Sequence, residues 1–476
     1  MARDQIVDMV NWWLKNSTSI GNSAQQISLV GGLFSWGVPV VGTGVLSNIT
    51  NVIVNGHSLG GHLATAFSRL FGGKLTIDHT YTYNSAGFNP ASELFFSNLE
   101  FILGEISTGE FPSNSQQTNF FADNGINVTT QDLFNGQVGN RIPIFNEEGV
   151  GFPNHYQYKL TDALALSVIV STLDNRFGFK ELSDLFESIS NKSERSLEKV
   201  LDILGVILNG SPLPDTPISD DAESEGRKVY HSNLFNLRSL LFIDPKSLTP
   251  VLKDEYKNLQ IVDVETLAYS SKNNDEAGYA YRYSLDNMIP FAIIGGKNLY
   301  EAFNNNGSLN AENFSEQYLT DRAAMLNWFT KFNEEDIDYG DKITTNDIKG
   351  NFIFTDLASS INSFKDLVLQ IDGIGGELPY QHFKFGTEYD DGILGADNDD
   401  RLYGRGGNDS ILGKDGDDYI DASYIKDMVD ELKNCDKNVW GYGKHFERVF
   451  LNNNMSIIHK KKSLSYNILF KRKIFY

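Results

Sequence analysis

Hydrophobic positions along the first 90 residues follow a helical period and then alternate between strand-like and helical segments. Residues 3–15 place an apolar set on one helical face, namely Ile6, Val7, Val10, Trp13 and Leu14. Residues 49–55 form a β-branched apolar run typical of a buried strand, residues 59–71 have helical spacing, and residues 79–83 form a second β-rich run. Strand, tight turn, helix and strand is the repeating unit of a parallel α/β sheet, so we expect an α/β fold.

The rest of the chain is less uniform. Helical spacing covers residues 160–208, a polar stretch rich in Pro, Asp and Ser at 211–227 indicates a loop or boundary, and residues 286–330 are expected to be packed helices. Composition changes abruptly at Gly386, where an acidic, glycine-periodic segment begins, and again after residue 425, where a basic tail follows. These changes predict four segments, at 1–210, 211–385, 386–425 and 426–476.

Composition excludes some classes of protein. The hydrophobic fraction of 41% is that of a globular chain, and a formal charge of −22 disfavours partners that present phosphates, so we expect no nucleic-acid partner. The single cysteine, Cys435, rules out an intramolecular disulfide. The first residues lack the basic-then-apolar pattern of a cleavable signal peptide, so Sec-type export is not expected.

A short motif at residues 56–60 indicates nucleophilic catalysis. Gly56-His57-Ser58-Leu59-Gly60 fits G-x-S-x-G and lies between a predicted strand and a predicted helix, the context in which a serine hydroxyl projects from a strained turn. The flanking glycines let the backbone pass closely, and the N–H of Leu59 at the helix start is placed to donate to an oxyanion. The alternative is a glycine-rich turn with no catalytic role.

A serine nucleophile needs a histidine base and an orienting carboxylate, which follow in the order Ser, acid, His on this fold. His155, in a loop before a helix, is preferred as the base over His231, which lies beyond the boundary at 211–227. Asp132 is preferred as the acid over Asp123, because it follows a short β-branched run and catalytic groups cluster at the carboxyl ends of strands. Either aspartate could instead be a turn residue.

Residues 386–421 consist of four consecutive nonapeptides, GTEYDDGIL, GADNDDRLY, GRGGNDSIL and GKDGDDYID. Each begins with glycine, has an aliphatic residue in the eighth place and has an aspartate in the sixth, namely Asp391, Asp400, Asp409 and Asp418. This is the pattern of calcium-binding parallel coils, in which glycine turns present carbonyl oxygens and the aspartate adds charge. We therefore expect Ca²⁺ binding, with this segment disordered at low calcium, and the alternative is an acidic linker.

The chain resembles bacterial lipases with RTX (hemolysin-type) calcium repeats, through GHSLGGHLA at 56–64, Asp132 and His155 in the expected order, and the nonapeptides. The resemblance implies an α/β-hydrolase catalytic domain at 1–210, a mixed helical extension at 211–385, a calcium β-roll at 386–425 and a tail of uncertain structure. It also implies a secreted lipid-ester hydrolase exported by a type I secretion apparatus, with calcium promoting folding after export.

Two features depart from this family. Only 57 residues precede Ser58, so we expect the sheet to lack N-terminal strands and the loop that gives the second oxyanion donor, whose loss costs about a hundredfold in rate. The basic tail also differs from the expected acidic-to-apolar secretion signal. The alternative function is therefore a calcium-binding secreted protein with an impaired hydrolase domain, and a peptidase or thioesterase on the same fold is a third possibility.

Overall fold

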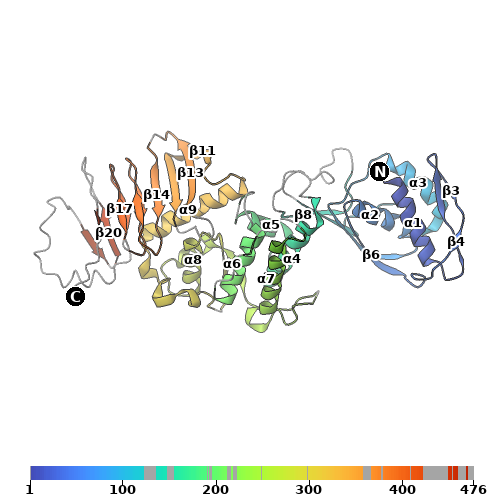
Figure 1. The fold of residues 1–476 in the computed structure, drawn as a ribbon, viewed down its shortest axis with the longest axis horizontal. Coiled ribbons are helices and arrows are strands. Elements are labelled where there is room, and N and C mark those ends of the chain that lie inside the picture. The colour runs from blue at the N-terminus through green and yellow to red at the C-terminus, as the bar shows by residue number, and fades with distance from the viewer. Residues whose placement is uncertain are drawn as a thin grey trace, which may run out of the picture. The chain divides into compact units, whose positions relative to one another are not determined.

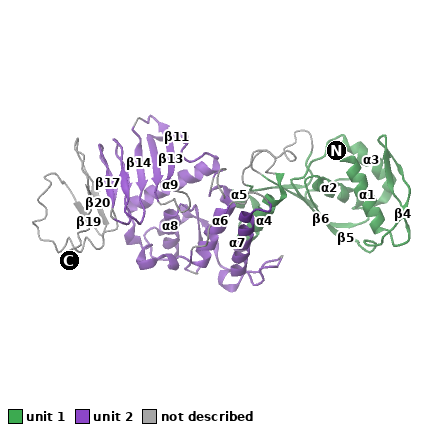
Figure 2. Cartoon of the chain, viewed as in Figure 1, with its two compact units in different colours: residues 1–171, 175–183 green, residues 172–174, 184–476 purple. Residues whose placement is uncertain are grey.

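The computed structural model describes most of the chain as two compact units (Figure 2). Described are residues 2–122, 136–146, 155–189, 191, 196–211, 216–217, 222–247, 249–296, 298–357, 366–376, 379–407 and 409–421, with strands at 449–452, 454–458 and 468–469. Unit 1 contains residues 1–171 and 175–183, and unit 2 contains residues 172–174 and 184–476. The segment boundary at residue 210 stays a prediction. Among the described helices, none has the length and apolar character needed to cross a membrane.

Unit 1 contains a four-stranded, all-parallel sheet with the strand order β5-β6-β7-β8. Its strands are β5 (Asn51–His57), β6 (Thr76–Tyr83), β7 (Gln117–Ala122) and β8 (Asn140–Ile144), and the helices of this part of the chain are α1 (Arg3–Ser17), α2 (Leu59–Phe71), α3 (Ser92–Leu103), the 3₁₀ turn η1 (Gly104–Ile106), α4 (Gln157–Leu173) and α5 (Phe179–Glu187). The predicted mixed α/β architecture with a parallel sheet is confirmed.

The core of unit 1 is formed by the apolar faces of the first helices. The helix predicted at 3–15 is α1, and its buried Trp13 meets Phe67 and Phe71 of α2 at ring-centroid distances of 5.0 and 5.8 Å. Leu70 of α2 is completely buried in the same cluster. Figure 1 shows α1, α2 and α3 gathered beside this sheet. This packing fixes α2, and with it the turn that precedes α2.

Residues between α1 and β5 form short antiparallel pairs outside the parallel sheet. β1 (Ser23–Ala24) pairs with β4 (Val40–Val41), and β2 (Ile27–Val30) pairs with β3 (Leu33–Trp36). Several large apolar side chains here are exposed, Val38 by 85%. In the described sheet β5 has a neighbour on one side only, so the strand that leads to Ser58 is an edge strand.

The first half of unit 2 is mainly helical. It contains α6 (Ser196–Asn209), α7 (Glu225–Leu241), α8 (Glu276–Asp286) and α9 (Glu316–Glu334), the strand pair β9 (Gln260–Asp263) and β10 (Phe291–Ile294), and the 3₁₀ segments η3 (Asp254–Tyr256), η4 (Val264–Ser270), η5 (Glu301–Phe303), η6 (Asn305–Gly307) and η7 (Ala311–Asn313). The expectation of helices across 286–330 is correct for α9 and wrong for β10. The run Phe291–Ile294 is short and apolar throughout, so its periodicity cannot distinguish a strand from a buried helix.

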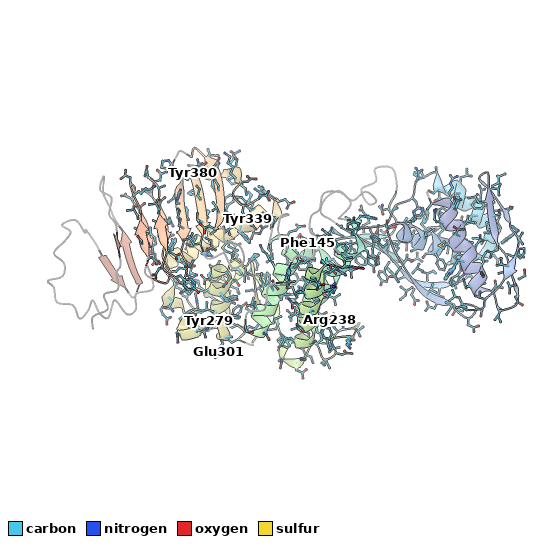
Figure 3. All side chains as sticks on the ribbon, in the orientation of Figure 1. Phe145, Arg238, Tyr279, Glu301, Tyr339 and Tyr380 are labelled. Atoms are coloured by element: carbon cyan, nitrogen blue, oxygen red, sulfur yellow. The ribbon has the colours of Figure 1, made fainter. Side chains whose placement is uncertain are left out.

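The second half of unit 2 is a stack of short strands. They are β11 (Lys342–Lys349), β12 (Asn351–Asp356), β13 (Leu367–Ile374), β14 (Gln381–Phe385), β15 (Gly392–Leu394), β16 (Arg401–Tyr403), β17 (Ser410–Leu412), β18 (Tyr419–Asp421), β19 (Val449–Asn452), β20 (Asn454–Ile458) and β21 (Ile468–Leu469). The larger sheet has the order β11-β13-β12-β14-β16-β18-β20-β19, and β15, β17 and β21 form a second one. Helix α9 runs beside the larger sheet (Figure 1), and Tyr339 follows α9 in the chain (Figure 3). The Tyr339 ring stacks on that of Phe329 in α9, with centroids 5.6 Å apart.

The strands of the nonapeptides pair in parallel with a constant offset. Ile393 in β15 pairs with Ile411 in β17, and Leu402 in β16 pairs with Ile420 in β18, each 18 residues apart. Successive nonapeptides therefore alternate between two sheets, and two repeats make one turn of a coil. The same 18-residue offset joins Phe383 of β14 to β16, so the coil begins before Gly386, where the composition changes.

Candidate active site

Ser58 occupies the turn between β5 and α2 in a conformation that non-glycine residues rarely adopt. Its φ of 56° and ψ of −121° lie outside the helical and extended regions, which costs about 1–3 kcal/mol. Three backbone hydrogen bonds hold it there: its N–H donates to the Tyr83 carbonyl at the end of β6 (2.9 Å), and its carbonyl accepts from the N–H groups of Gly61 (3.0 Å) and His62 (3.2 Å). The strained turn predicted from G-x-S-x-G is the turn that the chain forms.

The glycines around Ser58 are not equivalent. A Cβ atom on Gly56 would lie 2.1 Å from the Gly60 carbonyl oxygen, and one on Gly61 would lie 2.8 Å from the Ser85 hydroxyl oxygen. A Cβ atom on Gly60 would meet nothing within 4 Å. We expected that glycine on both flanks of Ser58 would be needed to let the backbone pass closely. This expectation is correct at Gly56 and wrong at Gly60. The second position where a side chain would collide is Gly61.

His155 is the histidine that the structure brings to Ser58. Its Nε2 atom lies 2.6 Å from the Ser58 Oγ atom, although the two residues are 97 positions apart in sequence. His155 is half-buried just before α4, and burial, followed by the charge of the neighbouring His57, lowers its pKa. A lowered pKa keeps the imidazole neutral near pH 7, the form that can accept a proton from a hydroxyl. His231, the alternative base, lies in α7 of unit 2 with its ring against Tyr230.

His57 makes a second contact to the same histidine. Its Nε2 atom lies 2.8 Å from the backbone carbonyl oxygen of His155, and the two rings lie 5.1 Å apart at 40°. Sequence reasoning assigned His57 only to the motif and missed this contact. Its place beside the predicted nucleophile was the one available signal.

The remaining predicted site residues have different outcomes. Leu59 is the first residue of α2, where backbone N–H groups have no carbonyl partner within the helix, and its role as an oxyanion donor stays a prediction. Asp132 and its competitor Asp123 lie outside the described residues, so the orienting carboxylate stays a prediction.

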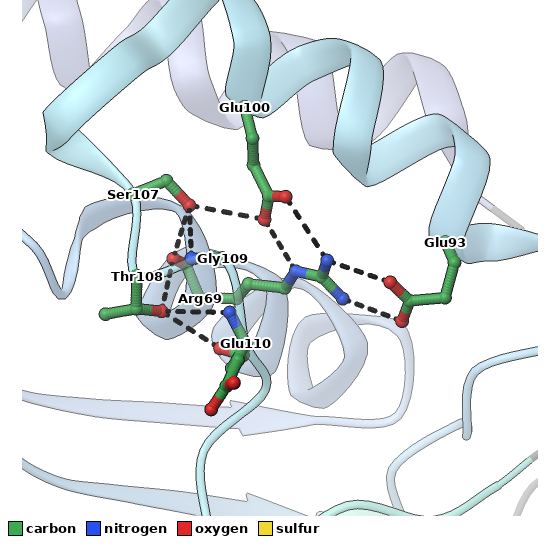
Figure 4. A network of polar contacts seen from close by, with 7 residues as sticks. All are labelled: Arg69, Glu93, Glu100, Ser107, Thr108, Gly109 and Glu110. Carbon is green, nitrogen blue, oxygen red and sulfur yellow. Dashed lines mark hydrogen bonds and ion pairs between the residues drawn. The ribbon is translucent and has the colours of Figure 1, made fainter.

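A buried arginine fastens the helix that carries this turn. Arg69 of α2 donates from Nη1 and Nη2 to Glu93 of α3 and from Nε to Glu100 (2.6 Å), as Figure 4 shows. Its guanidinium also lies 4.5 Å from the Phe111 ring centre. Its side chain is 3% exposed, against 58% for Glu93. The arginine therefore joins α2, the helix that follows Ser58, to α3.

The glycine that opens each nonapeptide lies under the aspartate of its own repeat. A Cβ atom on Gly395 would lie 2.4 Å from an Asp400 carboxylate oxygen, and one on Gly404 would lie 2.3 Å from Asp409. The carboxylates also join successive turns of the coil, because Asp400 accepts from the His382 N–H (2.7 Å), 18 residues earlier. The glycine that opens each nonapeptide is therefore needed to leave room for the aspartate five residues later, which explains why the two residues recur together.

Three of the four repeat aspartates, Asp400, Asp409 and Asp418, are buried. Burial, with repulsion from nearby acidic side chains, raises the pKa of Asp409 and of Asp418 to about 6, and burial raises that of Asp400. Carboxylates beside glycine-turn carbonyls are the oxygen donors that calcium prefers, so these residues fit such a cation. Within the described ranges, no group of three or more His, Cys, Asp or Glu side chains could hold a metal ion by side chains alone.

The aliphatic residues of the nonapeptides fill the interior of the coil. Ile393, Leu402 and Ile411 form a buried cluster with Ile420 packed against it.

Comparisons of this chain with protein-family models, with curated proteins and with solved structures find no significant match, so its function has to be argued from the site.

Proposed function

We propose that this chain is a serine hydrolase that cleaves lipid carboxylic esters through an acyl-enzyme. The observation that carries the proposal is the 2.6 Å contact between the Ser58 Oγ atom and the His155 Nε2 atom, made from a turn of positive φ. In the proposed reaction Ser58 attacks the ester carbonyl carbon while its proton passes to His155. The Leu59 N–H stabilises the oxyanion, and Asp132 orients His155.

The leaving alcohol takes the proton from His155 Nε2 as the carbon–oxygen bond breaks, which leaves the acyl group on Ser58. Water then attacks the acyl carbonyl and gives its proton to His155, and the acid leaves as Ser58 recovers its proton. Leu59, the neighbour of Ser58 in sequence, is an apolar residue that is 44% exposed, which supports an apolar substrate.

Calcium is the second part of the proposal. Asp391, Asp400, Asp409 and Asp418, with carbonyl oxygens of the glycine turns, would hold Ca²⁺ between turns of the coil, and bound calcium would neutralise their mutual repulsion. Export without a Sec signal, through a type I secretion apparatus, completes the proposal and rests on the resemblance alone.

A fluorophosphonate probe tests the hydrolase proposal. The folded wild-type chain should be labelled on the peptide that contains Ser58, and Ser58→Ala should abolish labelling. Ser47→Ala removes an exposed serine of the same segment and should leave labelling unchanged, which makes it the matched control. p-Nitrophenyl esters of increasing chain length should be hydrolysed, with a loss of at least about a thousandfold in Ser58→Ala.

Absence of labelling on the folded wild-type protein would contradict the hydrolase proposal. The alternative, a calcium-binding secreted protein with an impaired hydrolase domain, would then be favoured if far-ultraviolet circular dichroism still changed on calcium titration. Hydrolysis of thioesters or peptides in preference to oxygen esters would favour a thioesterase or a peptidase on the same fold.

A further inference from the structure

Two adjacent residues, His57 at the end of β5 and Ser58 after it, both contact His155. Ser58 contacts the His155 ring at Nε2, and His57 contacts the His155 backbone carbonyl oxygen at 2.8 Å. The ring and the backbone of the proposed base are therefore both held from one turn, across a sequence separation of 97 and 98 residues.

We propose that His57 is a positioning residue, which fixes His155 for proton transfer by donating its Nε2–H to the His155 carbonyl oxygen. This inference rests on the proposed hydrolase function. The hydrogen bond of His57 is to the main chain of the base and not to the reacting Ser58 Oγ or His155 Nε2 atoms.

Hydrogen-bond chemistry assigns the proton positions in this arrangement. A carbonyl oxygen only accepts, so the His57 Nε2 atom must carry a proton. The His155 Nε2 atom must be unprotonated to accept from the Ser58 hydroxyl, which leaves the proton of neutral His155 on Nδ1. In their neutral forms the two histidines therefore have opposite tautomers, and the His57 Nε2–H is the group that donates to the His155 carbonyl oxygen.

The position of His57 makes it a stiff support. His57 is the last residue of β5, where it pairs with Tyr83 of β6, and Ser58 next to it is fastened to β6 through its own N–H. A donor on this strand end keeps the base at a constant distance from the nucleophile. A base displaced by about 1 Å from its reacting partner costs about a hundredfold in rate.

The substitutions His57→Gln and His57→Asn test whether His155 needs a donor at the Nε2 position of His57 or only a polar side chain there. Glutamine places its amide nitrogen near the ε position of histidine, and asparagine places it near the δ position. We expect His57→Gln to keep kcat for ester hydrolysis within about threefold of wild type, and His57→Asn and His57→Leu to lose about ten- to a hundredfold in kcat with little change in KM. Second-order rates of fluorophosphonate labelling should follow the same order.

Equal kcat values in His57→Gln and His57→Asn, either both retained or both lost, would overturn the positioning role. An inactive wild-type protein would instead overturn the proposed hydrolase, so the two failures are distinguishable. Histidine-selective ¹⁵N spectroscopy of wild-type protein gives a readout that does not depend on the folding of His57→Asn. The His57 signal, assigned by its loss in His57→Gln, should be that of the Nε2–H tautomer, and an Nδ1–H tautomer would also refute the inference.

Discussion

Alanine substitution of Gly56 and of Gly60 separates two glycines that the G-x-S-x-G motif treats alike. A Cβ atom at Gly56 would lie 2.1 Å from the Gly60 carbonyl oxygen and 2.6 Å from the Gly61 nitrogen, which are backbone atoms of α2. A Cβ atom at Gly60 would have open space within 4 Å. Gly60 is also the second residue of α2, where alanine favours the helix more than glycine does.

The geometry sets the expected magnitudes. Ordinary Cβ contacts begin at 3.4 Å, so Gly56→Ala would have to move the start of α2 from β5 by more than about 1 Å. Overpacking against backbone that cannot rotate away should lower the free energy of unfolding by about 3 kcal/mol, and the displaced Ser58 should be labelled about a hundredfold more slowly. Gly60→Ala should instead raise the free energy of unfolding by about 0.5 kcal/mol.

Urea unfolding of the full chain, followed by tryptophan fluorescence, measures this difference. Trp13 is a suitable reporter because its ring packs on Phe67 and Phe71 of α2. The steric argument is refuted if Gly56→Ala unfolds within about 0.5 kcal/mol of wild type, or if Gly60→Ala destabilises the protein as much as Gly56→Ala does.

Three further predictions concern the arginine support, the proposed base and the repeats. Arg69→Met should lower the free energy of unfolding by about 2–4 kcal/mol in urea titrations, whereas Glu93→Gln, on a carboxylate that is 58% exposed, should lower it by less than about 1 kcal/mol; equal effects would contradict a buried anchor. Because His155 acts in its neutral form and its pKa is lowered, the labelling rate of Ser58 should stay constant from about pH 8 to 6.5 and fall only below that, and a fall beginning above pH 7 would contradict this. The raised pKa values of Asp409 and Asp418 mean that, in chelator, the folded repeats favour the protonated carboxyl groups. Thermal melts in chelator should therefore show the stability of the repeats falling as the pH rises from about 4 through 6. Calcium should remove that loss of stability, and a loss that persists in calcium would contradict the proposed site.

The local elements around Ser58 could be predicted closely from the sequence. The predicted helix 59–71 is α2 without change, and the predicted strand at 49–55 is β5 displaced by two residues. Both rest on strong local signals, a β-branched run and a helical apolar period separated by glycines. The contact between Ser58 and His155 was anticipated only as a chemical requirement, because no local pattern encodes a contact over 97 residues.

Other features could not be predicted because their cause is tertiary. Gly60 looks equivalent to Gly56 in the motif, and only the close approach of Gly56 to the first-turn backbone of α2 gives one glycine a steric role that the other lacks. The coil begins at β14, before Gly386, because strand pairing with β16 needs backbone and apolar side chains but not the glycine and aspartate period. The partner of His57 is the carbonyl oxygen of a residue 98 positions later, which no local pattern around His57 encodes.

Trapping of the acyl-enzyme tests the central claim most directly. Full-length protein mixed with excess p-nitrophenyl butyrate in calcium should release p-nitrophenol in a burst equal to the enzyme concentration. Acid quenching within the burst, followed by peptide mass spectrometry, should find one butyryl group on Ser58 in wild type and none in Ser58→Ala. Ester hydrolysis without that adduct, or with the same rate in Ser58→Ala, would contradict the account.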